Sequence, residues 1–179
     1  GHMNRLFSAV AKKVSSFVAS FVLVALAASP AIVNAWSPER PTYTIENPAP
    51  HVTFNSITNN PDEGDERAFF EVKDASNTQS NGFSHSMTGL KDGQELLMRV
   101  YVHNNAAENL NTQPDGQGGF KGIARNTKVR IHLPTATAPA LRANAYISAD
   151  NAQPGEVADT IDLEGLGAFS LEYVAGSAI

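Results

Sequence analysis

Cysteine is absent from all 179 residues of the chain. This absence excludes disulfide bonds, thiol catalysis and cysteine-ligated metal sites, so core packing alone has to hold the fold together. Charged residues are also scarce, at 17%, and the composition fits neither a disulfide scaffold nor a disordered polyelectrolyte. From Val14 to Ala35 there is no charge of either sign. The chain therefore divides into an apolar N-terminal segment and a polar, turn-rich remainder.

Residues 4–35 have the three parts of a secretory signal peptide, and residues 1–3 are interpreted as cloning residues followed by the start Met. The apolar run from Phe17 to Ala28 is expected to be the signal-peptide helix. Val33-Asn34-Ala35 supplies the small or branched residues that a cleavage site needs. The basic residues that precede the apolar run are Arg5, Lys12 and Lys13. We expect cleavage after Ala35, which leaves an exported chain that begins at Trp36.

The alternative to cleavage is a membrane anchor formed by the same segment. A spanning helix needs about 20 apolar residues, and Val14 to Ala35 reaches that length only by including serines, an asparagine and Pro30. Cleavage removes three cations and no acid, so the net charge changes from −5 to −8. No run of lysine or arginine remains, which makes nucleic acids and anionic lipid surfaces unsuitable partners.

Beyond the leader, alternation of apolar and polar residues is the dominant pattern and predicts strands. Residues 36–50 carry four prolines and are expected to form an extended lead-in arm. Residues 51–179 are expected to be one all-β domain, an immunoglobulin-like β-sandwich, because turn residues separate many short strands and no long helical period occurs. The predicted strands are His51–Thr58, Ala68–Lys73, Gln94–His103, Thr127–Leu133, Ala143–Ser148, Val157–Leu163 and Phe169–Val174.

One long connection interrupts this pattern. Residues 104–121 (NNAAENLNTQPDGQGGFK) are too polar for a core segment and predict a long exposed loop. Long loops at the ends of sandwich domains often carry binding function, although a tolerated insertion would have the same composition. The candidate binding residues in this loop are Asn109, Gln113, Asp115, Gln117 and Phe120.

Three segments carry a resemblance to a known family. In order they are QELLMRVYVHNN from Gln94, ARNTKVRIHLP from Ala124 and FSLEYVAGSA from Phe169. Together they resemble the bacterial cell-surface repeat known as domain of unknown function eleven. The resemblance covers about half of the predicted exported chain and implies an immunoglobulin-like β-sandwich of envelope and surface proteins.

A second resemblance involves the stretch from His51 to Phe83, which is similar to a segment of predicted secreted proteins from candidate-phyla bacteria. Those proteins have no assigned activity. In them the chain usually continues past Gly-Ser-Ala, whereas this sequence stops at Ile179. The resemblance therefore predicts a domain shortened at its C-terminus, with an edge strand prone to pairing with another chain.

The search for catalytic motifs indicates that the protein is not an enzyme. The sequence has no Gly-x-Ser-x-Gly elbow, no phosphate-binding glycine loop and no His-Glu-x-x-His motif. Ser84-His85-Ser86 places a histidine between two hydroxyls, but neighbouring residues of an extended segment point to opposite faces. No cofactor is expected.

A weak calcium site is the main metal candidate. Its ligands would be Asp62, Glu63, Asp65 and Glu66, four carboxylates in one short turn. The spacing of a calcium-binding helix-loop-helix is missing, and the alternative is a solvated hairpin tip with Arg67 reducing the repulsion. His103 and His132 lie on outward strand faces and would form a transition-metal site only if their strands paired.

These observations predict an exported structural or adhesive module at the bacterial cell surface, with a protein or glycan as partner and contact to the membrane only through an uncleaved leader. Two alternatives remain open. One is a secreted surface hydrolase with an unrecognised active site. The other is a pilus-like subunit that self-associates through an edge strand. Trp36 and Tyr43 of the lead-in arm are expected to pack back on the domain.

Overall fold

A computed structural model describes residues 2–12 and 40–179 of the chain. Within these ranges there are seven strands and one short 3₁₀ helix, η1 (Glu108–Thr112). The strands are β1 (His2–Lys12), β2 (Phe70–Asp74), β3 (Ser86–Leu90), β4 (Glu95–His103), β5 (Lys128–His132), β6 (Ala138–Ser148) and β7 (Glu156–Tyr173). The described chain is therefore an all-β fold, as the sequence predicted. The expected apolar helix from Phe17 to Ala28 lies outside the described residues.

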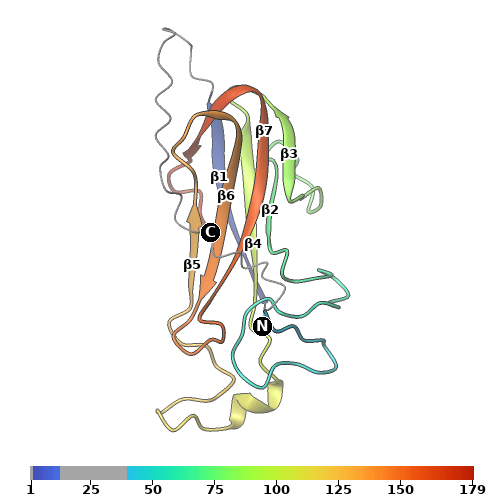
Figure 1. The fold of residues 1–179 in the computed structure, drawn as a ribbon, viewed down its shortest axis with the longest axis vertical. Helices are drawn as coiled ribbons and strands as arrows, with labels where there is room; N and C mark the ends of the chain where they lie inside the picture. Colours follow the sequence, from blue (N-terminus) through green and yellow to red (C-terminus); the bar gives the residue numbers. More distant parts are fainter. Residues whose placement is uncertain (1, 13–39) are drawn as a thin grey trace.

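The strands are ordered β2-β4-β1-β7-β6-β5, and β3 pairs with β7 outside this path. All neighbouring strands are antiparallel except β3 and β7, which are parallel. Figure 1 shows an elongated arrangement in which most connecting segments gather at the end that carries η1. This end, comprising residues 40–68 and 104–127, is called the loop end below.

Strand β7 connects two groups of strands because it is long and belongs to two ladders. Its first half pairs with β6 from Glu156 onward, and its last residues pair with β1. The sequence predicted two strands here, Val157–Leu163 and Phe169–Val174, and the structure corrects this to one continuous strand. Gly165 lies so close to Phe169 that a Cβ atom would be 2.7 Å from the ring. The glycine permits this close approach where β7 passes from one ladder to the other.

The core follows the alternation that the sequence displays. In β4 the residues Leu96, Met98, Val100 and Val102 are all buried. In β6 the buried set includes Leu141, Ala143, Ala145 and Ile147, and both sets belong to one hydrophobic cluster. Burying a side chain such as leucine, valine or methionine contributes about 1.5–3 kcal/mol. These inward faces account for most of the driving force of folding.

Strand β1 is the largest difference between the predicted organisation and the structure. It consists of residues 2–12, which the sequence analysis assigned to cloning residues and to the basic part of a leader. In the described chain β1 lies between β4 and β7, with its register running from His2 opposite His103 to Val10 opposite Glu95. Its side chains Phe7, Ala9 and Ala11 are buried in the core cluster. Residues 2–12 are thus part of the sheet of the full-length chain.

The predicted strand His51–Thr58 is wrong, because this segment makes only isolated bridges. Asn55 has a positive φ of 46°, which interrupts an extended strand. Val52 and Phe54 are buried, as their alternation indicated, but the polar residues between and after them are buried as well. The segment bridges to Asn104, just past the end of β4, rather than joining the sheet by a regular ladder.

Candidate functional site

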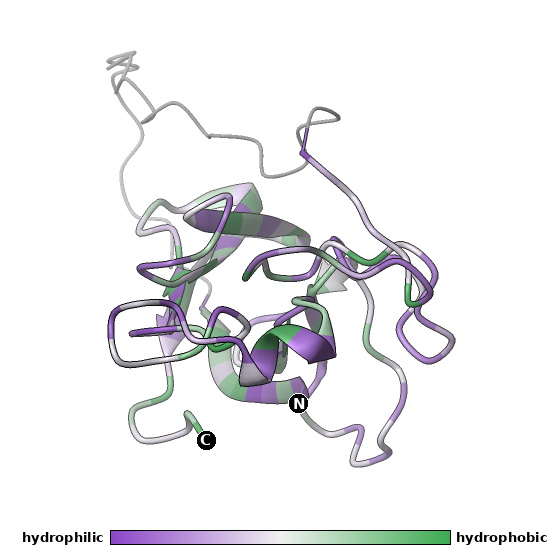
Figure 2. Ribbon diagram, turned by 90° about the horizontal axis from the view of Figure 1, so that it is seen from below, coloured by the Kyte–Doolittle hydropathy of each residue, from purple (hydrophilic) through white to green (hydrophobic). Residues whose placement is uncertain are grey.

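The candidate site is the loop end, where residues from the lead-in arm, the acidic turn and the long loop meet at the ends of β1 and β4. Figure 2 looks onto this end and shows connecting segments that are mainly hydrophilic, with a few apolar stretches among them. Several polar side chains at this end are buried nonetheless. Buried polar groups require hydrogen-bond partners, and those partners determine the shape of the loop end.

Glu66 is the centre of this polar network. Its side chain is fully buried, with 0% exposure. One carboxylate oxygen accepts hydrogen bonds from His103 Nδ1 at 2.8 Å and from Asn60 Nδ2 at 2.6 Å. The other accepts from Asn105 Nδ2 at 2.8 Å. Glu66 therefore joins the acidic turn, the end of β4 and the start of the long loop.

Two buried asparagines extend the network to the backbone. The Asn105 side-chain oxygen accepts from the backbone N–H groups of Ser56 and Ile57, at 2.5 Å and 3.2 Å. The Asn55 amide donates to the carbonyls of Glu66 and Tyr101, at 3.2 Å and 3.0 Å. These bonds satisfy backbone groups that no sheet ladder reaches. The loops are consequently tied to the sheet through side chains.

The lead-in arm is docked on this network. Arg40 is buried and donates to the carbonyls of Phe54 and Asn55 and to Ser56 Oγ. Burial lowers the pKa of Arg40 to about 10, and the nearby Arg67 adds to the effect. Tyr43 donates its backbone N–H to the Ser56 carbonyl at 2.8 Å. The packing expected of Tyr43 is thus present, while Trp36 lies outside the described residues.

Tyr101 lies on the same face of β4 as His103 and is only 4% exposed. Burial raises the pKa of its hydroxyl to about 12, and the negative charges of Glu66 and Glu63 contribute further. Its hydroxyl accepts from Asn60 Nδ2 at 3.4 Å. Tyr101 is therefore buried on the outward face of β4, where Leu97, Arg99 and His103 are half-buried.

The four carboxylates of the calcium candidate are directed to different partners. Glu66 points inward, Asp65 accepts three hydrogen bonds from the Arg67 guanidinium, and Glu63 lies 3.8 Å from Arg99. The bonds from Arg67 hold the pKa of Asp65 below its usual value. Asp62 is exposed. Within residues 2–12 and 40–179, no three histidine or acidic side chains gather closely enough to hold a metal ion.

The two candidate histidines are not brought together either. Strands β4 and β5, which carry His103 and His132, are not neighbours in the sheet. The strand pairing that a shared metal site required is therefore absent. His103 is instead bonded to Glu66, while His132 is exposed.

The long loop is held to the rest of the domain by a buried side chain and by hydrogen bonds. Leu110 of η1 is 8% exposed and anchors the loop. The Ala107 N–H donates to the Ala49 carbonyl at 2.8 Å, and Asn104 Nδ2 donates to the Gly122 carbonyl at 2.8 Å. Of the predicted binding residues, Asn109 and Gln117 are exposed, Gln113 and Asp115 are half-buried, and Phe120 is 46% exposed.

Asp115 shapes the tip of this loop. Its Oδ1 accepts from the backbone N–H groups of Gln117 at 2.7 Å and Gly119 at 2.9 Å. Its Oδ2 is paired with Arg125 Nη1. The bonds from the Gln117 and Gly119 N–H groups hold the pKa of Asp115 below its ordinary value, and Arg125 lowers it further. Asp115, predicted as a ligand contact, is a positioning residue for the loop.

Low pH should therefore break the hydrogen bonds that Asp115 accepts at the tip of the long loop. A carboxylate with a lowered pKa stabilises the folded loop at all pH values above its ordinary value of 3.8 and loses this effect as the pH falls through the lowered pKa. We expect Asp115→Ala to abolish the exchange protection of the Gln117 and Gly119 amides at neutral pH, measured by NMR. In the unmodified chain these amides should lose protection only in strong acid. Glu108→Ala, an exposed change in the same loop, should leave them protected; equal exchange in all three proteins would contradict this role.

The fixed loop carries exposed apolar side chains. Phe120 is 46% and Ile123 is 48% exposed. The Phe120 carbonyl accepts from the Ile123 N–H at 3.1 Å, and the Ile123 carbonyl accepts from Asn151 Nδ2 at 2.9 Å. Ile123 was not among the predicted binding residues, because a lone isoleucine in a polar stretch gives no signal of its exposure.

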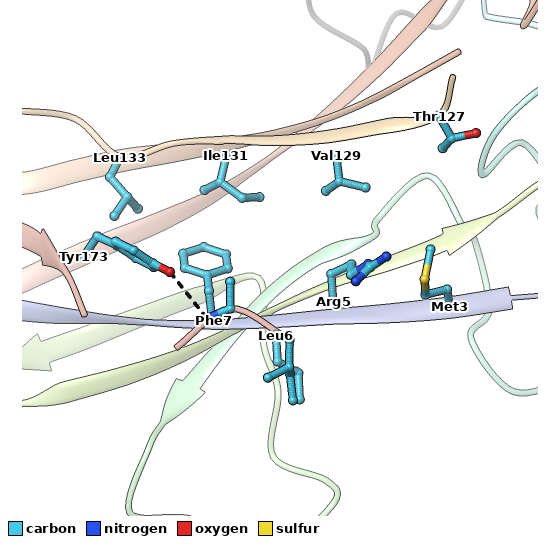
Figure 3. A pocket seen from close by; sticks show the side chains of 11 residues that line it. Met3, Arg5, Leu6, Phe7, Thr127, Val129, Ile131, Leu133 and Tyr173 are labelled. Carbon is cyan, nitrogen blue, oxygen red and sulfur yellow. Dashed lines mark hydrogen bonds between the residues drawn. The ribbon is translucent and has the colours of Figure 1, made fainter. Parts of the chain in front are cut away.

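A second concave feature lies between β1 and β5. It is an apolar groove of about 760 Å³. Met3, Arg5 and Phe7 line it from β1, and Val129 and Ile131 line it from β5 (Figure 3). Tyr173 lines it at the end of β7. No sequence pattern predicted this groove, because its two walls, β1 and β5, are far apart in the sequence.

Comparison with known proteins adds no family: no family model, no curated protein and no solved structure matches the chain. Among the described residues no helix is long and apolar enough to cross a membrane. The apolar run of the expected leader lies outside those residues.

Proposed function

We propose that the chain is an exported cell-surface module, an immunoglobulin-like β-sandwich that binds a protein or glycan partner through its loop end. The proposal rests on one observation: the long loop has a fixed backbone and carries exposed apolar side chains. Its backbone is fixed by Leu110 and Asp115, while Phe120 and Ile123 remain exposed. Ordered surfaces with exposed aromatic and aliphatic side chains bind with a small loss of conformational entropy.

The proposed function includes export through a signal peptide, and no catalytic activity is proposed for the chain. The signal-peptide helix would lie at Phe17 to Ala28, followed by cleavage after Ala35. Glu66 and His103 form an acid–imidazole pair, but both side chains hold the loops to the sheet. The hydrolase alternative gains no support from them, whereas the pilus-like alternative gains support from β1, as argued below.

The test of the proposed function is a substitution of both exposed apolar residues. Beads coated with the full-length chain should bind purified cell envelope from the producing bacterium, and Phe120→Ser with Ile123→Ser should reduce this binding about tenfold or more. Leu166→Ser is the matched control, because Leu166 is 74% exposed but lies on β7. Equal binding by all three proteins would exclude the loop as the contact surface. Point substitutions are preferable to deleting residues 109–119, since deletion also removes the buried Leu110.

A further inference from the structure

The position of β1 makes the sheet dependent on a segment that export would remove. Strand β1 pairs with β4 along nine residues and with β7 along four. The backbone of Ala11 also bonds with Gln94 and Gly93, and the carbonyls of Ser8 and Leu6 accept from the C-terminal residues Val174 and Ile179. Without β1, the facing edges of β4 and β7 lose these partners, and the core loses Phe7, Ala9 and Ala11.

Export and the pairing of β1 exclude one another. The basic end of a leader remains on the cytoplasmic side while the apolar segment enters the membrane. Residues 2–12 and residues 40–179 would then lie on opposite sides of the membrane, yet in the structure they share one sheet. The described fold is therefore that of the unprocessed chain, and the exported domain has an open strand position between β4 and β7.

The fit of β1 to this position is incomplete at one end. Phe7 stacks on Phe70 with ring centroids 6.2 Å apart, and Ala9 and Ala11 are fully buried. Toward its start β1 is exposed, and the groove of about 760 Å³ between β1 and β5 is left unfilled there, with the exposed Arg5 among its mostly apolar lining residues. In Figure 3 Arg5 lies opposite Val129, and Met3 lies opposite Thr127, just before the start of β5. Among the described residues, no carboxylate forms an ion pair with Arg5.

We propose that the position held by β1 is a strand-acceptor site, filled in the exported protein by an extended segment of another polypeptide. The inference rests on the proposed export and cleavage of the leader. Strand addition supplies main-chain hydrogen bonds for affinity, and alternate side chains supply specificity. In the unprocessed chain β1 occupies this position and pairs with both β4 and β7.

The structure defines the chemistry of the incoming segment. It runs antiparallel to both β4 and β7, as β1 does. Its inward residues are small at the positions of Ala9 and Ala11, where no space remains, and large and aromatic or aliphatic at the position of Phe7. At the positions of Met3 and Arg5 it carries bulky apolar side chains that fill the groove against Val129 and Ile131. A charged residue at the position of Phe7, Ala9 or Ala11 would be buried without a partner.

The experiment uses the folded full-length chain with a protease site introduced just before Arg40. After cleavage, the chain is incubated with an excess of fluorescent peptides of residues 2–12, and their exchange with the bound N-terminal fragment is followed by fluorescence anisotropy. We expect one peptide to bind per chain. The Arg5→Ile peptide should bind about tenfold more tightly than the unchanged peptide, because it fills the groove. The Ala9→Glu peptide should bind at least about 100-fold more weakly, because it buries a charge.

Three results would overturn the proposal. The first is a cleaved chain that stays folded and takes up no peptide. The second is equal binding of the Arg5→Ile and unchanged peptides. The third is a cleaved chain that forms a dimer without added peptide, which would assign the site to a second copy. Peptide uptake by Phe120→Ser with Ile123→Ser should be unchanged, so a failure of the loop-end function is distinguished from a failure of the acceptor site. The mass of the exported protein tests leader cleavage separately.

Discussion

Replacing Glu66 by alanine is expected to cost about 3–5 kcal/mol of the free energy of unfolding, because three donors lose their acceptor and each unsatisfied buried donor costs about 1–3 kcal/mol. The side chain is fully buried and accepts bonds from His103, Asn60 and Asn105. Alanine leaves these three donors without their acceptor, and water cannot reach them without opening the loop end. Because Asn105 in turn binds the Ser56 and Ile57 backbone, the loss should spread beyond the single site.

Urea unfolding of the full-length chain measures this effect. Glu66→Gln should recover part of the loss, since one amide oxygen still accepts while the amide nitrogen faces another donor. Glu63→Ala is the matched control, because Glu63 is in the same turn but partly exposed and lies 3.8 Å from Arg99. It should cost about 0–1 kcal/mol. Equal and small losses for Glu66→Ala and Glu63→Ala would show that the buried network does not hold the loop end.

Phe7→Ala is expected to destabilise the unprocessed chain by about 3–5 kcal/mol, the range for deleting a buried aromatic ring. Phe7 is 7% exposed and stacks on Phe70 in the core. This result distinguishes two roles for residues 2–12. A targeting segment that stays outside the fold predicts no change in stability, whereas a central strand predicts a large one.

Thermal and urea unfolding of the full-length chain provide the measurement. Asn4→Ala is the control, because Asn4 is exposed on the same strand, and it should change stability by no more than about 0.5 kcal/mol. If Phe7→Ala unfolded like the unmodified chain, β1 would not be part of the stable sheet, and the acceptor site would lose its basis.

Much of the fold could be predicted from alternation alone. The segments Gln94–His103 and Thr127–Leu133 were expected as strands and correspond closely to β4 and β5. Alternation is informative there because one face of each strand is more buried than the other. It failed for His51–Thr58, where both faces are buried, and for β3, which is short and mostly exposed. A period of two cannot appear where burial does not alternate.

The candidate site was less predictable. The sequence indicated a binding loop and an acidic turn, and both lie at one end of the domain (Figure 1). It could not separate Glu66 from its three acidic neighbours, because burial of a carboxylate depends on donors far away in the chain. His103 is 37 positions from Glu66 and Asn105 is 39 positions away. Such contacts leave no local pattern.

The sequence by itself determined the all-β class, the absence of covalent cross-links and the charge and apolar character of the N-terminal segment. These properties depend on composition and on local periodicity. The tertiary structure alone decided that residues 2–12 are a central strand, that Glu66 is the buried centre of the loop end and that a groove opens between β1 and β5. Each of these depends on segments distant in sequence meeting across the sheet, where long-range packing and hydrogen bonding override the local pattern.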